Sequence, residues 1–353
     1  MSAKGIASII VTAVLLGGVP APRQAGAQAK PIQIKLGTSP AAGTPPYQAL
    51  QVMADKWRKA PAGGVDLIPS NPKGSEDKLV SKLLVGELQG VLVSVTGLSK
   101  IDDSAKALED LPFMFRSLDE VEYVRKKLTP EIEKKFLDKG YVVLFWGDIG
   151  WVRFFSKEPM IHPADLKKMK IFTWAGDPSQ ANIMTAAGFN PVPLDTDFIL
   201  TSLQTGLINV VPTAPLIANV GQFDSQTRHM LEINYAPLVG GAVITRKAWN
   251  SIPQAAQDAL RISALEAGNS FTKNSRAQND QMVETMKKKS ALIVHAVTPE
   301  IEAEWRALAK SIYPKIRGSI VPADMFDRVS ALLDEYRAAN PSGTSRPLAG
   351  IAK

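Results

Sequence analysis

The sequence has no cysteine and three histidines among its 353 residues. Without cysteine there is no disulfide, thiol nucleophile, zinc–thiolate site, iron–sulfur cluster or lipid anchor attached through sulfur. A chain of this length can be stabilised by core burial without disulfides. The histidines form neither an H-x-H nor an H-x-x-x-H pair, and they are His162, His229 and His295. We therefore predict no metal site.

Catalytic motifs are also missing. The chain contains no G-x-S-x-G, no P-loop and no G-x-G-x-x-G, which are the sequence patterns of common hydrolases and of nucleotide-binding enzymes. The carboxylates show no paired spacing that isolates two of them. We predict no catalytic residue and no cofactor; a secreted enzyme without a recognisable nucleophile is the alternative.

Long hydrophobic runs are absent apart from one near the N-terminus. Lys4 precedes an apolar run at residues 6–19, and Ala27-Gln28-Ala29 follows it. This pattern predicts a secretory signal peptide over residues 1–29, cut after Ala29; an uncleaved anchor is the alternative. No later run reaches the roughly 18 apolar residues that a membrane-spanning helix needs. We expect an exported, periplasmic protein that does not itself span a membrane.

The charge balance is mildly basic. The formal net charge is +7, from 41 basic and 34 acidic residues. Removing residues 1–29 takes away Lys4 and Arg23, which leaves 39 − 34 = +5. The basic residues are interspersed with acidic ones, so no patch for nucleic acid is indicated.

Alternating strand and helix patterns predict an α/β fold. Apolar residues at alternate positions indicate a strand from Ile32 to Leu36, and helical spacing follows at 47–57. A further strand, helix and strand are predicted at 65–68, 79–88 and 91–95. Such alternation is typical of a mostly parallel sheet.

The middle of the chain continues this pattern. We predict one helix from Ser117 and a second that begins at Thr129-Pro130, then strands at 141–146 and 151–155. A helical region over 252–288 is unusually long for a compact protein, which indicates a helix that crosses between domains or breaks midway.

Residues 165–215 are predicted to form a strand, helix, strand, helix and strand. Asp177-Pro178 begins the first helix and Gly188 ends it; Gly206 ends the second. Ligands of open α/β sheets bind at the carboxyl ends of the strands. We therefore expect this unit to form one wall of a ligand cleft.

Five sequence words in order resemble the DctP-type solute-binding proteins of TRAP transporters. These are LEDLPFMF, PADLKKMKI, GFNPVPL, LQTGLIN and WNSIPQAAQDAL, at residues 108–115, 163–171, 188–194, 203–209 and 249–260. The resemblance covers about residues 32–336.

The resemblance implies a two-lobed periplasmic binding protein fold with hinge strands and a long lobe-spanning helix. Lobe I would hold residues 30–150 and 240–280, lobe II residues 151–239 and 281–335, and 340–353 would be a flexible tail. Such a protein closes on a small organic ligand and delivers it to membrane permease subunits; a monomer is expected. A ligand-responsive accessory protein of a membrane sensor is the alternative.

The resemblance also implies where the ligand-gripping residues lie. An arginine that holds a substrate carboxylate in most of the family falls on Phe172 here. A second family arginine falls on Val152, with Arg153 one residue away. The family asparagine of the third strand falls on Thr213.

The expected ligand-binding residues combine these positions with neighbouring aromatic and hydroxyl side chains, and they are Phe172, Trp174, Thr213, Trp151, Arg153, Ser94, Thr96 and Ser39. Because the first arginine is replaced by Phe172, we expect a ligand less anionic or more apolar than a C4-dicarboxylate. A monocarboxylate held by Arg153 is the alternative.

Overall fold

The computed structural model describes residues 31–60, 64–70 and 75–341. The predicted signal peptide and all but the first two residues of the predicted tail at 340–353 lie outside the described residues. The strands in the described part of the chain form one nine-stranded sheet, in the order β2-β1-β3-β8-β4-β7-β5-β6, with β9 beside β8. Their bounds are β1 Ile32–Thr38, β2 Val65–Ser70, β3 Gly90–Ser94, β4 Tyr141–Ser156, β5 Lys170–Trp174, β6 Asn190–Leu194, β7 Val210–Thr213, β8 His229–Thr245 and β9 Ile293–His295.

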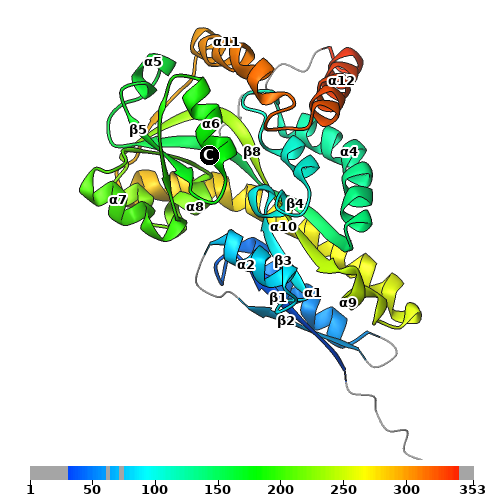
Figure 1. Cartoon of the computed structure of the whole chain (residues 1–353). Helices are drawn as coiled ribbons and strands as arrows, with labels where there is room; N and C mark the ends of the chain where they lie inside the picture. Colours follow the sequence, from blue (N-terminus) through cyan, green and yellow to red (C-terminus); the bar gives the residue numbers. More distant parts are fainter. Residues whose placement is uncertain (1–30, 61–63, 71–74, 342–353) are drawn as a thin grey trace, which may run out of the picture. The chain divides into compact units, whose positions relative to one another are not determined.

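Helices cover this sheet (Figure 1). Their bounds are α1 Pro45–Arg58, α2 Glu76–Leu84, α3 Val95–Leu98, α4 Leu118–Asp138, α5 Pro163–Leu166, α6 Pro178–Ala186, α7 Ile199–Thr205, α8 Pro215–Val220, α9 Arg246–Asn250, α10 Gln254–Lys289, α11 Pro299–Ile316 and α12 Ala323–Ala339, with 3-10 turns η1 Asp103–Leu108, η2 Thr196–Phe198 and η3 Phe223–Ser225. The predicted helix boundary at Thr129-Pro130 was wrong, because α4 continues through Pro130.

Two long antiparallel strands, β4 and β8, connect the two ends of the sheet. β8 pairs with β3 at one end, and β4 pairs with β7 at the other. Below, β1–β3 with α1–α3 are called the β1 half, and β5–β7 with α6–α8 the β5 half. The predicted break between strands 141–146 and 151–155 is a register shift between Asp148 and Trp151 within the continuous strand β4.

Helix α10 has 36 residues and is continuous, so of the two alternatives predicted for 252–288 the break midway does not occur. It contacts α1 in the β1 half and α8 in the β5 half, and it packs along β4 (Figure 1). Its buried residues divide accordingly. Leu260, Ala264 and Phe271 join the core around Trp57, whereas Val283 and Met286 join the core around Phe172.

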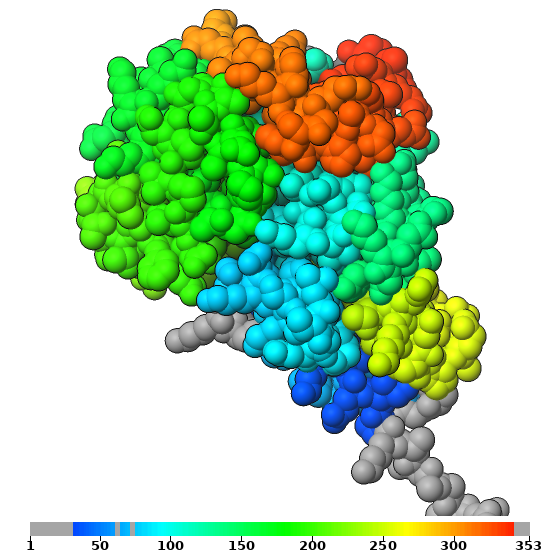
Figure 2. Space-filling model, in the orientation of Figure 1, coloured from blue at the N-terminus to red at the C-terminus, as the bar shows by residue number. Residues whose placement is uncertain are grey.

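The two C-terminal helices pack on different neighbours. Helix α11 contacts α5 and α6, whereas α12 contacts α4 and η1. In Figure 2 the orange and red surface of these helices adjoins both the green and the cyan segments. The lobe boundaries predicted above place α12 and α4 in different lobes, so contacts beyond the strands and α10 join the two predicted lobes.

Candidate functional site

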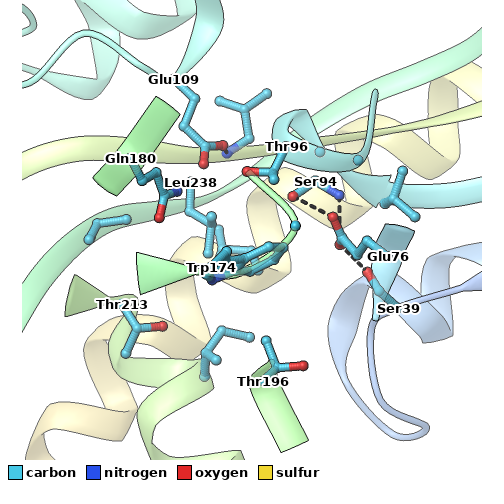
Figure 3. A pocket seen from close by; sticks show the side chains of 18 of the residues that line it. Ser39, Glu76, Ser94, Thr96, Glu109, Trp174, Gln180, Thr196, Thr213 and Leu238 are labelled. Atoms are coloured by element: carbon cyan, nitrogen blue, oxygen red, sulfur yellow. Dashed lines mark hydrogen bonds between the residues drawn. The ribbon is translucent and has the colours of Figure 1, made fainter. Parts of the chain in front are cut away.

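A cavity of about 480 Å³ lies between the β1 half and the β5 half. Its lining includes the carboxyl ends of β1 and β3 on one side and of β5, β6 and β7 on the other. Parallel strands place their carboxyl ends at one sheet edge, which is where open α/β sheets bind ligands. Most of the lining side chains are apolar, and the polar ones converge on a few positions (Figure 3).

Glu76 organises the β1 side of the cavity. This first residue of α2 accepts hydrogen bonds from Ser39 Oγ at 2.5 Å, Ser94 Oγ at 2.6 Å and Ser94 N at 2.9 Å (Figure 3). Burial raises the pKa of Glu76, and the two serines oppose that rise. One carboxyl group thus joins the ends of β1, β3 and α2. Ser39 and Ser94, two of the predicted ligand-binding residues, line the cavity, and their hydroxyls donate to Glu76.

The turn after β3 fits closely around this carboxyl group. A Cβ atom at Gly97 would lie 2.9 Å from Glu76 Oε2 and 2.9 Å from a methyl carbon of Val93. Any side chain there would displace the Glu76 carboxyl or the strand. Thr96, the preceding residue, is buried and lines the cavity.

A second acidic position, missed from the sequence, lies between η1 and β8. Glu109 is 7% exposed, and its Oε2 accepts a hydrogen bond from Val239 N at 2.9 Å. Burial, reinforced by the charge of Asp110, raises the pKa of Glu109 well above its usual range. Both residues lie in the sequence word LEDLPFMF, but no pattern in the sequence distinguishes them from the other carboxylates, so neither was predicted as a site residue.

Asp110 is buried beside Glu109 and also lines the cavity. Burial, reinforced by the charge of Asp177 and opposed by that of Lys106, raises the pKa of Asp110 to about 7. Asp110 Oδ2 is buried without a hydrogen-bond partner among the described residues. This carboxyl group is therefore poorly solvated and has no direct ionic partner.

On the β5 side, Trp174 and Thr213 reach the cavity from the ends of β5 and β7 (Figure 3). Phe172 does not reach it: the ring is 2% exposed and belongs to a core cluster with Phe155, Ile199 and Val211. Two strand residues span about 6.6 Å, so Phe172 lies that much deeper in the β5 half than Trp174, at the same face of β5.

Strand β4 presents Val152 to the cavity and Arg153 away from it. Successive residues of a strand point to opposite faces, although a register shift between Val152 and Phe154 interrupts the pairing of β4 with β8 there. Arg153 pairs with Glu232 at 3.1 Å, outside the cavity lining. Trp151 is buried in a core cluster. The structure therefore brings neither Trp151 nor Arg153 to the cavity.

The charged lining is predominantly acidic. Among the described residues of the lining there is no arginine and one lysine, Lys100. Lys100 Nζ donates to Gly176 O at 2.7 Å and pairs with Asp77 at 3.2 Å, so it links the two halves. The carboxyl groups of the lining are Glu76, Asp77, Glu109, Asp110, Asp195 and Asp197.

Neither a metal centre nor a membrane span emerges from the part of the chain that the structure describes. No group of three or more His, Cys, Asp or Glu side chains there could hold a metal ion. None of the helices described is both long enough and apolar enough to cross a membrane.

Two strands that connect two α/β halves, with a ligand-sized cavity between the halves, define a two-lobed binding protein. The chain belongs to the DctP family, bacterial extracellular solute-binding proteins of family 7, whose model matches residues 36–318. The family consists of extracytoplasmic solute receptors, so the protein is a solute-binding protein and not an enzyme.

Three relatives illustrate the family. The C4-dicarboxylate-binding periplasmic protein DctP of Rhodobacter capsulatus is 21% identical over 296 residues, which is 82% of this chain and 88% of the relative. The 2,3-diketo-L-gulonate-binding periplasmic protein YiaO of Escherichia coli is 27% identical, over 65% of this chain and 70% of the relative. A TRAP periplasmic solute-binding protein of Shewanella oneidensis with bound succinate superposes with a TM-score of 0.77 at 20% identity, covering 86% of this chain and 99% of that one.

Proposed function

We propose that this protein captures a small organic ligand in the cavity and delivers it to a TRAP permease, and that the ligand is less anionic or more apolar than a C4-dicarboxylate. The observation that carries the ligand class is the charge of the lining, where the described residues supply six carboxyl groups, one lysine and no arginine.

A dicarboxylate needs a strong anion partner inside a cavity. Guanidinium groups provide this in a bidentate geometry that other side chains lack. The positions where the family resemblance implies arginines hold Phe172, in the core, and Val152, at the cavity wall. Arg153 lies outside the cavity lining and pairs with Glu232 at 3.1 Å, which favours this ligand class over the alternative of a monocarboxylate held by Arg153.

The apolar part of the lining suits an apolar ligand body. Trp174, Val152 and Leu238 lie among the lining residues, and a cavity of about 480 Å³ is within the range of small-molecule sites. Few polar groups among apolar walls fix the orientation of a ligand rather than supply most of its affinity.

Capture by closure is supported by contacts that cross the cavity. Lys100 Nζ donates to Gly176 O, and Lys106 Nζ donates to Ser179 Oγ at 3.0 Å. Both lysines precede β4, whereas both acceptors follow it. Hinge motion about β4 and β8 would break these hydrogen bonds on opening, which is a recognised mode of ligand-gated closure.

The decisive experiment is mass spectrometry of the small molecules released by denaturing the purified protein, followed by calorimetry with succinate at low and high salt. We expect a molecule without two carboxylates to be released, and succinate to bind weakly. Tight, salt-sensitive succinate binding would overturn the proposed ligand class. Loss of uptake of the released compound on gene deletion would support transport, whereas a lost transcriptional response with intact uptake would support the sensor alternative.

A further inference from the structure

The Glu109 carboxyl group lines the cavity. Its side chain is 7% exposed, and Figure 3 shows its carboxyl group directed into the cavity. Val239 N occupies Oε2, whereas Oε1 accepts no hydrogen bond from any described residue. Oε1 is therefore open to the cavity and can accept a hydrogen bond from a ligand.

Its surroundings are acidic on several sides. Asp110 follows it in the chain, Glu76 faces it from α2 and Asp177 from the start of α6, and each of these raises the pKa of Glu109. In η1, Asp103 raises the pKa of Asp110 and Lys106 lowers it. Burial, and after it the charges of Asp110 and Glu109, raise the pKa of the Tyr235 hydroxyl in β8. Lys106 is held by Asp103 at 3.1 Å and by Ser179.

No ion pair in the described part of the chain involves Glu109 or Asp110. Lys106 acts on Asp110 without a direct ion pair, and two adjacent buried carboxyl groups that lack an ion pair favour a cation from outside. Trp174 lines the same cavity with a half-buried ring, and the face of an indole attracts cations in addition to apolar groups.

We propose that the ligand carries a cationic nitrogen that pairs with Glu109 and Asp110, while its apolar body contacts Trp174. The inference rests on the proposed solute-binding function and specifies the ligand class for it: an organic ammonium compound with a hydrocarbon or aromatic body. Direct hydrogen bonding of the ammonium group to Glu109 Oε1 satisfies the acceptor that the protein leaves open.

Proton linkage distinguishes this ligand from a carboxylate. In the empty cavity burial favours the protonated acids, and a bound cation favours the carboxylates, so binding releases protons. The affinity for an ammonium compound therefore rises with pH up to and through about 7, where Asp110 titrates. A carboxylate ligand would need the protonated acids as donors, so its affinity would fall over the same range.

The test uses matched probes that share one apolar body: benzylamine, benzyl alcohol and benzoate, and the corresponding cyclohexyl series. Melting temperature and calorimetry of the full mature chain are measured at pH 6, 7 and 8, in two buffers of different ionisation enthalpy. We expect the amines to bind best, with release of protons and an affinity that rises up to tenfold per pH unit below the carboxyl pKa.

Glu109→Gln should lower amine affinity at least tenfold and remove most of the proton release. Glu133→Gln is the matched control, because this carboxyl accepts from Trp146 Nε1 at 3.0 Å and lies outside the cavity lining; it should change neither quantity.

Stronger binding of the alcohols or carboxylates, no response to the amines, or equal effects of the two variants would overturn the cation site. Any of these results leaves the solute-binding function standing if a probe binds or a small molecule is released from the protein. A protein that releases no molecule and binds no probe would contradict the proposed function itself.

Discussion

Two buried acidic sites of this protein differ in the partners that surround them. Asp148, in the middle of β4, is fully buried and accepts two hydrogen bonds at 2.7 Å from the Arg276 guanidinium and one at 3.1 Å from Arg125. Glu109 and Asp110 are buried almost as deeply, but no ion pair is formed by either in the part of the chain that the structure describes. Burying a charge is costly unless an opposite charge pairs with it. Asp148 has such partners within the protein, whereas we infer that a ligand supplies the partner of Glu109 and Asp110.

The location of each site matches this difference. Asp148 lies at the register shift of β4, and its two arginines come from α4 and α10. The ion pairs thus join the crossing strand to the long helix near the hinge. Glu109 and Asp110 lie beside the cavity instead. We therefore assign Asp148 a role in stabilising the fold, and Glu109 and Asp110 a role in ligand binding.

The largest expected effect is on the paired site. Asp148→Ala leaves Arg276 and Arg125 partly buried without their anion, and breaking a buried pair in this way typically destabilises by about 3–5 kcal/mol. Urea unfolding followed by circular dichroism measures the change. Asp327→Ala is the control, because Asp327 pairs with Arg317 at the surface and screening by solvent makes such pairs weak. Equal midpoints for the two variants would remove the structural role assigned to Asp148.

Removing the Asp110 carboxyl from the unpaired site should stabilise the empty protein, whereas removing Asp148 should destabilise it. Burial raises the pKa of Asp110 in the folded protein to about 7, whereas the unfolded chain titrates near 3.8. The folded state thus binds more protons between these values, and the free energy of unfolding falls as the pH rises from about 4 to about 7.

Asp110→Asn should therefore flatten this part of the stability–pH curve and raise the stability of the empty protein at pH 8, by on the order of 2–4 kcal/mol at most. Thermal melts between pH 4 and pH 8 with the ligand removed test it. Asp324→Asn is the comparison: the pKa of Asp324 is lowered, with Lys135 as its partner, so its loss should not stabilise the protein. A slope that Asp110→Asn leaves unchanged would show that Asp110 is not the titrating group.

Sequence patterns predicted much of the fold and less of the site. The order of strands and helices and the long helix followed from hydrophobic periodicity. The continuity of β4 did not, because Gly147 and Gly150 are typical of breaks, while pairing with β8 holds the strand together through the shift.

Within the site, the residues at strand ends lie where the sequence suggested, as Trp174, Thr213 and Ser94 line the cavity. Phe172 lies deeper than Trp174 and does not reach the cavity. The sequence could not predict this, because the distance between a strand residue and the cavity depends on where the strand ends in the folded protein. Glu109 could not be separated from the solvated carboxylates, because its burial results from packing between η1 and β8.

The smallest expected effect tests whether the missing arginine decides the ligand class. Val152 lines the cavity from β4, at the position where the family resemblance implies an arginine. Val152→Arg places a guanidinium group opposite the acidic lining and offers a carboxylate a bidentate partner. We expect succinate or benzoate affinity to rise about tenfold, or about 1.4 kcal/mol, and amine affinity to fall, both measured by calorimetry.

The control for that variant is Val85→Arg, which adds the same charge at a side chain that is 74% exposed and outside the lining. Melting curves first establish that both variants fold. Because surface charge acts only over roughly 10 Å at moderate salt, the control should leave both affinities unchanged. If the two variants altered carboxylate binding equally, long-range charge rather than the wall position would explain the effect. If Val152→Arg folded and still rejected carboxylates, the acidic pair at Glu109 and Asp110 would be sufficient to exclude them, with or without an arginine at the wall.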